Sequence, residues 1–313
     1  MSRVNEIIDN IEKIMVGKRR IVERVVMALL VNGHVLLEDV PGVGKTQCAS
    51  ALAKSVDGSF KRVQFTPDVM ASDITGFTMY NPSEGKFIYR EGAANCNFLL
   101  ADEINRASAK TQSSLLEVME ERQITIDGVT RKVPEPFMVI ATQNPIESRG
   151  TNKLPEAQMD RFLFKLTIGY PSRKGEKEIL DRFGIENPLK YLESVVTKDE
   201  VIELQKEVDE IKVSDNIKDL IINIVVYTRG NQKIALGVSP RGSLYLLKAS
   251  KAFAYLKERD YVLPEDVQEI AAEVLSHRII LSSSAKVKGI TAYEVITECV
   301  NKAIKEMSKV LDV

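Results

Sequence analysis

The sequence is poor in the features that mark metal proteins, membrane proteins and nucleic-acid-binding proteins. Its 313 residues include three cysteines and two histidines, without metal-ligand spacing. The longest apolar run, residues 25–31, is far shorter than the roughly 20 residues that cross a bilayer. A formal net charge of −1 gives no long-range attraction to DNA, RNA or an anionic membrane. We therefore expect no membrane partner, and nucleic acid ranks last among the possible partners.

The few cysteines and histidines are expected to be packed residues. Cys48, Cys96 and Cys299 are widely separated and cannot all pair, so we expect reduced, mostly buried thiols. His34 and His277 lie far apart in the sequence, and each is expected to pack rather than to bind a metal. The N-terminal segment carries charges among its apolar residues and lacks the apolar core of a signal peptide. We therefore expect a cytoplasmic protein.

Length and composition favour a globular chain of two domains. Charged residues make up 28% and hydrophobic residues 44% of the chain, as in ordinary soluble proteins. A chain of 313 residues exceeds the usual size of a single hydrophobic core. We place the boundary where a proline follows the last predicted strand, which gives domains of residues 1–171 and 172–313.

The first domain shows the alternation of strands and helices that is typical of an α/β fold. Apolar spacing predicts helices, for example over residues 49–56, and a parallel sheet flanked by helices follows. The Asp127-Gly128 pair between alternating segments predicts a hairpin over residues 123–133, and a second hairpin is expected over residues 77–89. The predicted strands are residues 35–38, 62–66, 98–101, 137–142 and 162–168.

The second domain is expected to be all helical. Strand signals end near residue 171, and helix-start signals follow it. These are Thr197 with Glu200, Ser239 before Pro240, and Thr291 with Glu294.

Residues 35–46 combine a strand, a glycine-containing loop and a helix start. In this context Gly42 and Gly44 let backbone N–H groups turn toward phosphates, Lys45 neutralises phosphate charge, and Thr46 ligates magnesium. Asp39 stands where the phosphate-loop pattern has its first glycine. Aspartate tolerates left-handed backbone better than most residues, so the loop remains compatible with phosphate binding. An incidental Gly-Lys-Thr turn is the alternative, which the flanking strand and helix disfavour.

Two carboxylates follow the next predicted buried strand. Asp102 and Glu103 come at its carboxyl end, the edge where open α/β sheets bind ligands. Asp102 would hold magnesium through water, and Glu103 would polarise a water for attack on a γ-phosphate. A solvated strand end would also carry such a pair, but the phosphate loop upstream argues for the catalytic interpretation.

Three further polar residues are candidates for the same chemistry. Asn144 follows a third buried strand and could orient the attacking water, although Asn before Pro145 also forms ordinary turns. Arg161 ends a short predicted helix and could reach a neighbouring subunit's nucleotide. Arg241 lies in the first turn of a helix, where the dipole disfavours a cation. A bound phosphate would explain its position, and a salt bridge to the first domain is the alternative.

Several motifs together closely resemble the MoxR family of AAA+ ATPases across nearly the whole chain. The resemblance implies a P-loop core with a five-stranded parallel sheet and two hairpin inserts, followed by an all-α lid. The motifs are LLEDVPGVGKT (36–46), FLLADEINRASAKTQSSLLEVMEERQITIDG (98–128), VIATQNPIES (139–148), LPEAQMDRFLFKL (154–166) and GVSPRG (237–242).

The resemblance also assigns roles by position. The ATP-binding residues would be Val16, Gly17, Pro41, Gly42, Val43, Gly44, Lys45, Thr46 and Gln47, and the Mg²⁺ residues Thr46 and Asp102. The catalytic residues would be Glu103, Asn144 as the first sensor, Arg161 as the arginine finger and Arg241 as the second sensor. Val16 and Gly17 would cradle the adenine, Gln64 would restrain Glu103, and Asp39 would be a tolerated variant in the loop.

The function implied is an ATP-driven remodeller of a client protein. An arginine finger acting between subunits requires a homo-oligomeric ring, which the resemblance makes a hexamer, with a von Willebrand factor A domain protein as a common partner. The alternatives are a nucleotide-gated scaffold with negligible turnover and, last, a nucleic-acid motor. A GTPase is disfavoured because the sequence has no NKxD motif.

Overall fold

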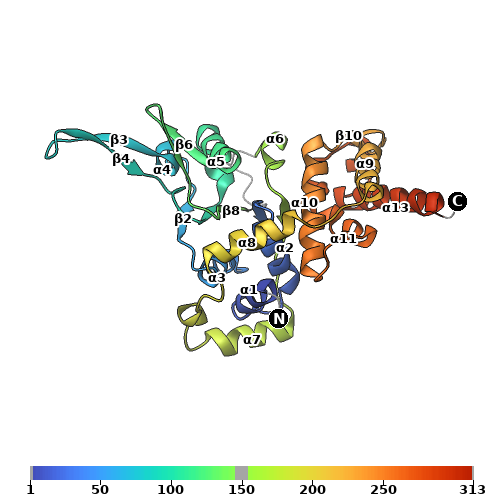
Figure 1. Cartoon of the computed structure of the whole chain (residues 1–313), viewed down its shortest axis with the longest axis horizontal. Helices are drawn as coiled ribbons and strands as arrows, with labels where there is room; N and C mark the ends of the chain where they lie inside the picture. The colour runs from blue at the N-terminus through green and yellow to red at the C-terminus, as the bar shows by residue number, and fades with distance from the viewer. Residues whose placement is uncertain (1–2, 145–153, 312–313) are drawn as a thin grey trace. The chain divides into compact units, whose positions relative to one another are not determined.

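The described residues form two compact units. The computed structural model describes residues 3–144 and 154–311 (Figure 1). The first unit takes in the chain up to Pro155 and Leu166–Glu203, and the second takes in Glu156–Lys165 and the chain from Leu204 onward. The domains predicted at residues 1–171 and 172–313 stay a prediction. Packing groups residues 156–165 with the C-terminal part of the chain and residues 172–203 with the N-terminal part.

A five-stranded sheet forms the centre of the α/β fold, in the order β2-β5-β8-β1-β9. Neighbouring strands β2 and β5, β5 and β8, and β8 and β1 run parallel. All residues of β5 and β8 are buried, which explains their continuous apolar sequences. The bounds are β1 (Val35–Glu38), β2 (Phe60–Gln64), β5 (Phe98–Asp102), β8 (Met138–Gln143) and β9 (Phe164–Leu166).

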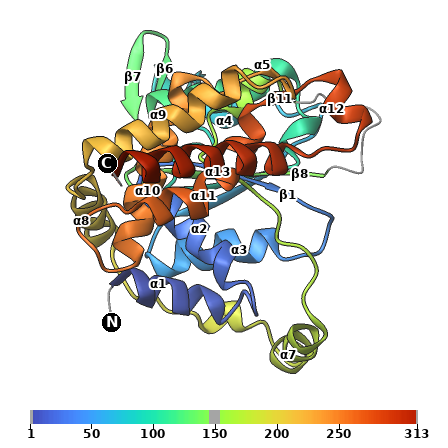
Figure 2. The same ribbon diagram turned by 90° about the vertical axis from the view of Figure 1, so that its right-hand side faces the viewer.

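Helices with apolar faces pack against this sheet and against one another. Helix α1 buries Val4, Ile7, Ile8 and Ile11, the spacing of one helical face. It contacts both α2 and α3, which lie beside it in Figure 2. The helices of the first unit are α1 (Arg3–Glu12), α2 (Arg19–Leu30), α3 (Lys45–Ser55), α4 (Ala71–Thr75), α5 (Ala109–Glu121) and α7 (Arg173–Phe183), with 3₁₀ turns η1 (Ile104–Arg106) and η2 (Pro188–Tyr191).

His34 is a packed residue just before β1. Its Nδ1 accepts from the Val139 N–H at 3.0 Å, and its Nε2 donates to the Met119 carbonyl at 3.1 Å. Burial, together with the charge of Arg122, lowers the pKa of His34 to about 3, so the ring is neutral. The prediction that this histidine packs within the protein is confirmed.

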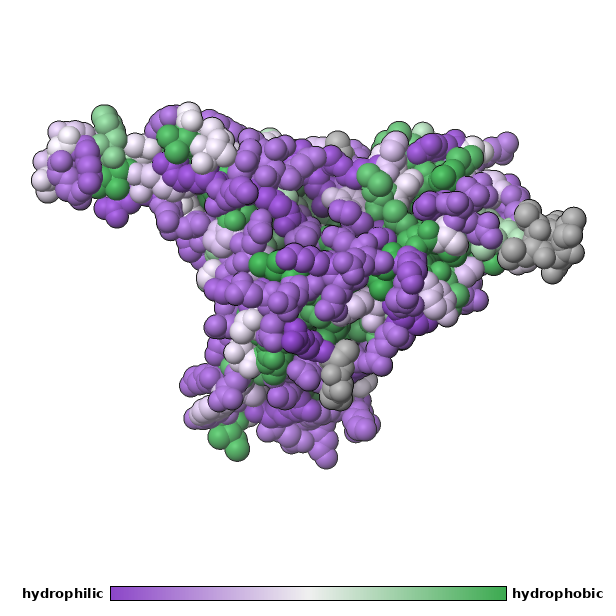
Figure 3. Space-filling model, viewed as in Figure 1, coloured by the Kyte–Doolittle hydropathy of each residue, from purple (hydrophilic) through white to green (hydrophobic). Residues whose placement is uncertain are grey.

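Both predicted hairpins are present in the first unit. Strands β3 (Gly76–Asn81) and β4 (Lys86–Glu91) pair antiparallel, as do β6 (Gln123–Ile126) and β7 (Val129–Lys132). The β3–β4 hairpin extends away from the sheet (Figure 1) and carries apolar surface (Figure 3). The exposed fractions of Phe77, Tyr80 and Phe87 are 47%, 52% and 73%.

The second unit is built from packed helices. Helices α9, α10 and α11 contact one another, and α13 contacts α9 and α11. The four helices lie close together in Figure 2. Thr197 and Thr291 form reciprocal caps with Glu200 and Glu294 before α8 and α13, as predicted. Helix α8 (Lys198–Asp209) begins in the first unit and continues into the second at Leu204. The other bounds are α6 (Glu156–Met159), α9 (Asp215–Arg229), α10 (Pro240–Leu256), α11 (Pro264–Leu275), η3 (Ser276–Arg278), α12 (Ser283–Val287) and α13 (Ala292–Leu311).

The predicted fold class, a parallel five-stranded core sheet with a helical lid, is confirmed, with one addition. Short strands β10 (Ile234–Leu236) and β11 (Ile280–Leu281) pair antiparallel in the second unit. This ribbon was not expected from the sequence, because two- and three-residue strands carry too little alternation to be recognised. Within residues 3–144 and 154–311, no helix is both long and apolar enough to cross a bilayer.

Candidate nucleotide site

The loop between β1 and α3 has the backbone of a phosphate-binding loop. Gly42 and Gly44 have φ angles of 86° and 97°, a left-handed region that glycine enters without strain. Gly44 is the N-cap of α3, so the first turn of this helix directs its N–H groups toward the loop. The Lys45 Nζ donates to the Asp39 carbonyl at 2.7 Å, across the loop. The loop and the start of α3 therefore form an anion-binding helix N-terminus, with the Lys45 side chain beside it.

Asp39 fits this loop for a different reason from the one expected from the sequence. It is not among the described residues with positive φ, so tolerance of left-handed backbone is not the reason it fits. Its carboxylate accepts the Val40 N–H at 2.8 Å and the Gly169 N–H at 2.6 Å. Asp39 is only 6% exposed. The side chain therefore ties the start of the loop to the segment that follows β9.

Asp102 and Glu103 lie where the sequence placed them, at the carboxyl end of β5. Thr142, on the neighbouring strand β8, connects the two residues. Its hydroxyl donates to Asp102 Oδ1 at 2.6 Å and accepts the Glu103 N–H at 2.8 Å. Asp102 is 8% exposed, whereas Glu103 is half-buried and has a left-handed φ of 56°. The threonine therefore holds the Asp102 carboxylate and the Glu103 backbone.

Each acidic side chain also has a cationic partner. Arg62, on β2, donates from Nη2 to Asp102 Oδ2 at 2.7 Å. Arg106, in η1, donates from Nη1 to Glu103 Oε2 at 2.8 Å. The predicted restraint of Glu103 by Gln64 is not the contact observed, because the Gln64 amide oxygen accepts from Arg62 at 3.1 Å.

Asn144 directly follows β8 and is 6% exposed. Strand β8 lies between β5 and β1 in the sheet. Because parallel strands end at one edge, Asn144 shares that edge with the acidic pair and the phosphate loop. Pro145 and the rest of the predicted motif to residue 148 lie outside the described residues.

The turn around Val16 and Gly17 lies beside the phosphate loop. A Cβ at Gly44 would be 3.6 Å from the Met15 sulfur, so this turn and the loop are neighbours. Gly17 has a φ of 66° and is exposed, whereas Val16 is 6% exposed. The arrangement is compatible with the predicted contact to a nucleotide base.

Arg161 and Arg241 both belong to the second unit. Arg161 follows α6, and Arg241 is the second residue of α10. Each is half-buried. The structure thus groups the predicted residues in two sets, with the phosphate loop, Asp102, Glu103 and Asn144 in the first unit.

The residues of the first unit fit a magnesium nucleotide. The glycine backbone, the Lys45 ammonium and the Thr46 hydroxyl supply donors and an oxygen ligand of the kinds that phosphate and Mg²⁺ take. The buried Gln47 Oε1, in the same helix turn, has no hydrogen-bond partner among the described residues. The ion pair between Arg62 and Asp102 would have to break before that carboxylate could bind a metal ion.

Several residues at this edge of the sheet were not predicted from the sequence. Thr142, Arg62 and Arg106 contact the acidic pair directly. Asn105 is 7% exposed, and its Oδ1 lacks a partner within the part of the chain that the structure describes. Thr142 is one of the two polar residues that end the apolar strand β8, and this was the one available signal. The arginine contacts depend on strand register and loop geometry.

Comparisons with known proteins give the same fold and identify the family. Residues 34–164 match the ATPase family associated with various cellular activities (AAA), and residues 226–299 match the AAA lid domain. The chain is 51% identical to the uncharacterized protein YeaC of Bacillus subtilis, over 93% of this chain and 91% of that protein. It is 44% identical to the chaperone MoxR1 of Mycobacterium tuberculosis, over 88% of this chain and 75% of that protein.

A solved structure shows the same architecture. A crystal structure of a Cytophaga hutchinsonii protein assigned as an ATPase superposes with a TM-score of 0.89 and 39% identity. The superposition covers 96% of this chain and 94% of that one. Together with the sheet order, the phosphate loop and the acidic pair, these similarities establish that the chain belongs to the MoxR family of AAA+ ATPases.

Proposed function

We propose that the chain hydrolyses ATP to ADP and phosphate with Mg²⁺, in an oligomeric ring that remodels a client protein. The observation that supports this most directly is the Thr142 bridge, with distances of 2.6 and 2.8 Å to Asp102 and Glu103. A solvated strand end would not need one buried hydroxyl to hold both the Asp102 carboxylate and the Glu103 backbone. The bridge is suited to two acidic residues with separate roles, because it fixes one carboxylate and the backbone that bears the other.

Each residue of the first unit has a defined task in this proposal. Lys45 leaves the Asp39 carbonyl and binds the β- and γ-phosphates. Thr46 and Asp102 would hold the magnesium ion, which neutralises phosphate charge when bound. Glu103 orients a water and accepts its proton during in-line attack on the γ-phosphate. Asn144, at the same edge, donates to that water or to a γ-phosphate oxygen.

The arginines of the second unit complete the site between subunits. Arg161 stabilises charge on the transferring phosphoryl group of a neighbour, an effect of about 10³ to 10⁵ in rate in related enzymes. Arg241 binds phosphate in its own subunit or in the neighbour. The isolated chain is therefore nearly inactive, and a homo-oligomer, which we take to be a hexamer, is the active form.

The remodelling role is supported by the relatives and by the shape of the first unit. One relative is named a chaperone, and the exposed β3–β4 hairpin offers apolar contacts for a client. A protein with a von Willebrand factor A domain is the expected partner, and the cytoplasm is the expected location. A nucleotide-gated scaffold is the alternative, and it differs from the remodeller in having negligible turnover.

Steady-state ATP hydrolysis at increasing protein concentration tests the proposal. We expect activity to rise more than linearly for the wild type. It should fall by about 10²- to 10⁴-fold in Glu103→Gln and by at least about 10³-fold in Arg161→Ala. Glu121→Gln and Arg173→Ala change exposed residues of the same types and should keep wild-type activity. Absence of hydrolysis by the wild type at every concentration would favour the scaffold.

The same preparation can test the nucleic-acid motor. Affinity for DNA that falls steeply with salt, together with DNA-stimulated hydrolysis, would support a motor. We expect neither, because the net charge of −1 provides no general attraction to a polyanion.

A further inference from the structure

The backbone around Arg161 is held by side chains of the second unit at four successive carbonyls. Arg278 donates from Nη2 to the carbonyls of Asp160 at 3.1 Å and Phe162 at 2.5 Å, and from Nη1 to that of Leu163 at 3.3 Å. The Tyr245 hydroxyl donates to the Arg161 carbonyl at 3.2 Å. All these residues belong to the second unit. A segment outside regular secondary structure is thus fixed on both sides of the predicted finger.

Arg278 is a structural cation at the centre of this arrangement. Its side chain is 1% exposed, and its Nε donates to Asp160 Oδ1 at 2.8 Å. Its guanidinium also lies 4.8 Å from the centre of the Tyr245 ring. Burial lowers the pKa of Arg278 to about 10, which leaves the side chain charged at neutral pH. A buried fork with carbonyl and carboxylate partners has few alternative geometries.

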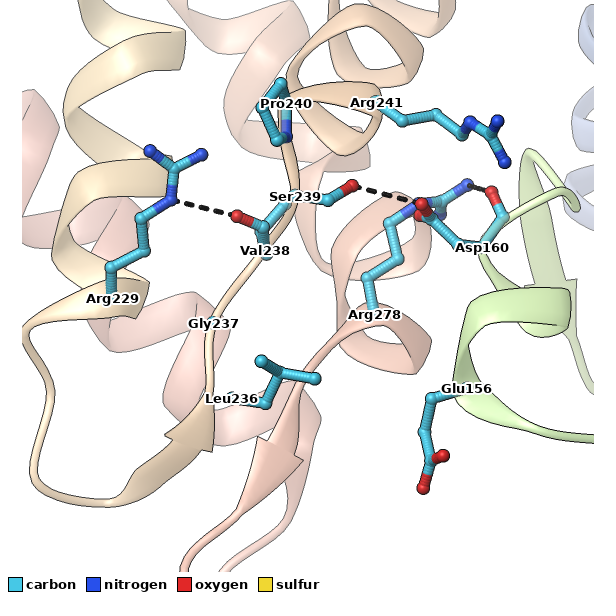
Figure 4. Close-up of a pocket in the computed structure, with 10 residues that line it drawn as sticks. All are labelled: Glu156, Asp160, Arg229, Leu236, Gly237, Val238, Ser239, Pro240, Arg241 and Arg278. Carbon is cyan, nitrogen blue, oxygen red and sulfur yellow. Dashed lines mark hydrogen bonds and ion pairs between the residues drawn. The ribbon is translucent and has the colours of Figure 1, made fainter.

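Asp160 connects the same segment to the start of α10. Its Oδ2 accepts the Ser239 hydroxyl at 3.0 Å, and Ser239 is the N-cap residue of α10. Figure 4 shows this contact and the Asp160–Arg278 ion pair beside the Arg241 side chain, which extends from the first turn of α10. These residues line a cavity of about 670 Å³. The predicted arginine finger, Arg161, and the predicted second sensor, Arg241, are therefore connected by one set of hydrogen bonds.

We infer that Asp160, Ser239, Tyr245 and Arg278 are positioning residues that make Arg161 move as one body with α10 and Arg241. The inference rests on the proposed function, in which Arg161 acts on a neighbouring subunit's nucleotide. Movement of α10 in one subunit is then transmitted directly to the finger in the next active site.

Mixed rings test this arrangement by separating the two roles of a subunit. Glu103→Gln subunits supply a finger but cannot hydrolyse ATP, and Arg161→Ala subunits can hydrolyse it only with a neighbour's finger. Mixing the two should recover activity. Tyr245→Phe, which removes one hydroxyl, is then placed either in the finger-supplying subunit or in the hydrolysing subunit. Ser239→Ala is tested in the same way.

We expect each substitution to lower kcat about threefold to tenfold only in the finger-supplying subunit, as for one lost hydrogen bond, with KM for ATP unchanged. Tyr255→Phe removes a hydroxyl from the same helix, where it contacts the exposed Glu207, and should have no effect in either placement. Equal losses in both placements, or no loss in either, would overturn the positioning role while leaving the shared site intact. Failure of the unsubstituted mixture to recover activity would refute the shared site and the positioning role together.

Hydrogen exchange gives a readout that does not depend on ATP. Amides in peptides covering residues 156–165 should exchange several-fold faster in Tyr245→Phe and Ser239→Ala than in the wild type and Tyr255→Phe. Unchanged exchange in both variants would show that these contacts do not hold the segment, and would overturn the inference.

Discussion

Restoring the usual glycine at the first position of the phosphate loop should weaken this protein. The pattern has glycine where the chain has Asp39, so similarity alone would suggest that Asp39→Gly is neutral or favourable. The structure predicts the opposite, because Asp39 has no left-handed φ for glycine to relieve. The substitution instead removes the acceptor of the Gly169 N–H at 2.6 Å and of the Val40 N–H at 2.8 Å.

The expected loss can be worked from these contacts. A hydrogen bond to a buried carboxylate contributes about 1.5 to 3 kcal/mol, and glycine adds roughly 0.5 to 1 kcal/mol of unfolded-state entropy. The contact of Asp39 with the adjacent Val40 is partly available in the unfolded chain, so we assign it nothing. Asp39→Gly should therefore lower the free energy of unfolding by about 2 to 4 kcal/mol.

Asp57→Gly is the matched control in the same unit. Asp57 is exposed and has a φ of 51°, a conformation that glycine adopts with less strain. Its replacement should change the free energy of unfolding by less than about 1 kcal/mol. Both variants can be compared with the wild type by urea unfolding followed by far-UV circular dichroism. An Asp39→Gly protein as stable as the wild type, or equal losses in the two variants, would refute the role assigned to the Asp39 carboxylate.

Three other predictions concern buried polar groups. Thr142→Val should cost about 2 to 4 kcal/mol of stability, more than Thr228→Val, because only the first removes a donor to a carboxylate. His34 has a pKa near 3 in the folded protein and about 6.5 when unfolded. The free energy of unfolding should therefore decrease as the pH is lowered from 6.5 toward 3, by about 1.4 kcal/mol per pH unit. Burial raises the pKa of Cys48 to about 12 and of Cys96 to about 11, so neither thiol should react with Ellman's reagent at pH 8 until urea is added.

Each of these predictions has a result that contradicts it. Equal losses of stability in Thr142→Val and Thr228→Val would show that the hydrogen bond to Asp102 adds no more stability than one to a carbonyl. For the histidine, the unfolded chain binds one more proton than the folded chain in that pH window, so a His34→Gln variant should show a shallower slope. Parallel slopes for the two proteins would count against the neutral buried ring. Rapid modification of all thiols in the native protein would show that the two cysteines are accessible.

Most of the fold followed from patterns that are local in the sequence. The strands at residues 35–38 and 98–102 are apolar runs that end in an acidic residue. The Asp127-Gly128 turn and the helix caps depend only on neighbouring residues. The strand expected at residues 62–66 lies at 60–64, because β2 at the sheet edge is half-exposed and its apolar pattern is weak. The ribbon of β10 and β11 was missed because its strands are two and three residues long and far apart in the chain.

The candidate site also has a part that could be predicted from local sequence and a part that could not. The positions of Lys45, Asp102, Glu103 and Asn144 at strand ends follow from the order of the elements. The hydrogen-bond partners of these residues could not be predicted from the order of the elements, since Arg62 reaches Asp102 only through the register of β2 on β5. The frame of Arg278 around Arg161 joins residues more than a hundred positions apart, a contact that no periodicity can indicate.

The resting place of Lys45 has a consequence for the order of binding. Its ammonium lies on a neutral carbonyl, so moving it to a phosphate oxygen exchanges a dipole for an anion and breaks no ion pair. Asp102, by contrast, is ion-paired with Arg62, and an arriving cation must compete with that guanidinium. The loop therefore receives a polyphosphate more readily than the acidic edge receives a metal. Metal-free nucleotide should bind before magnesium alone does, and the ion should enter already attached to its nucleotide.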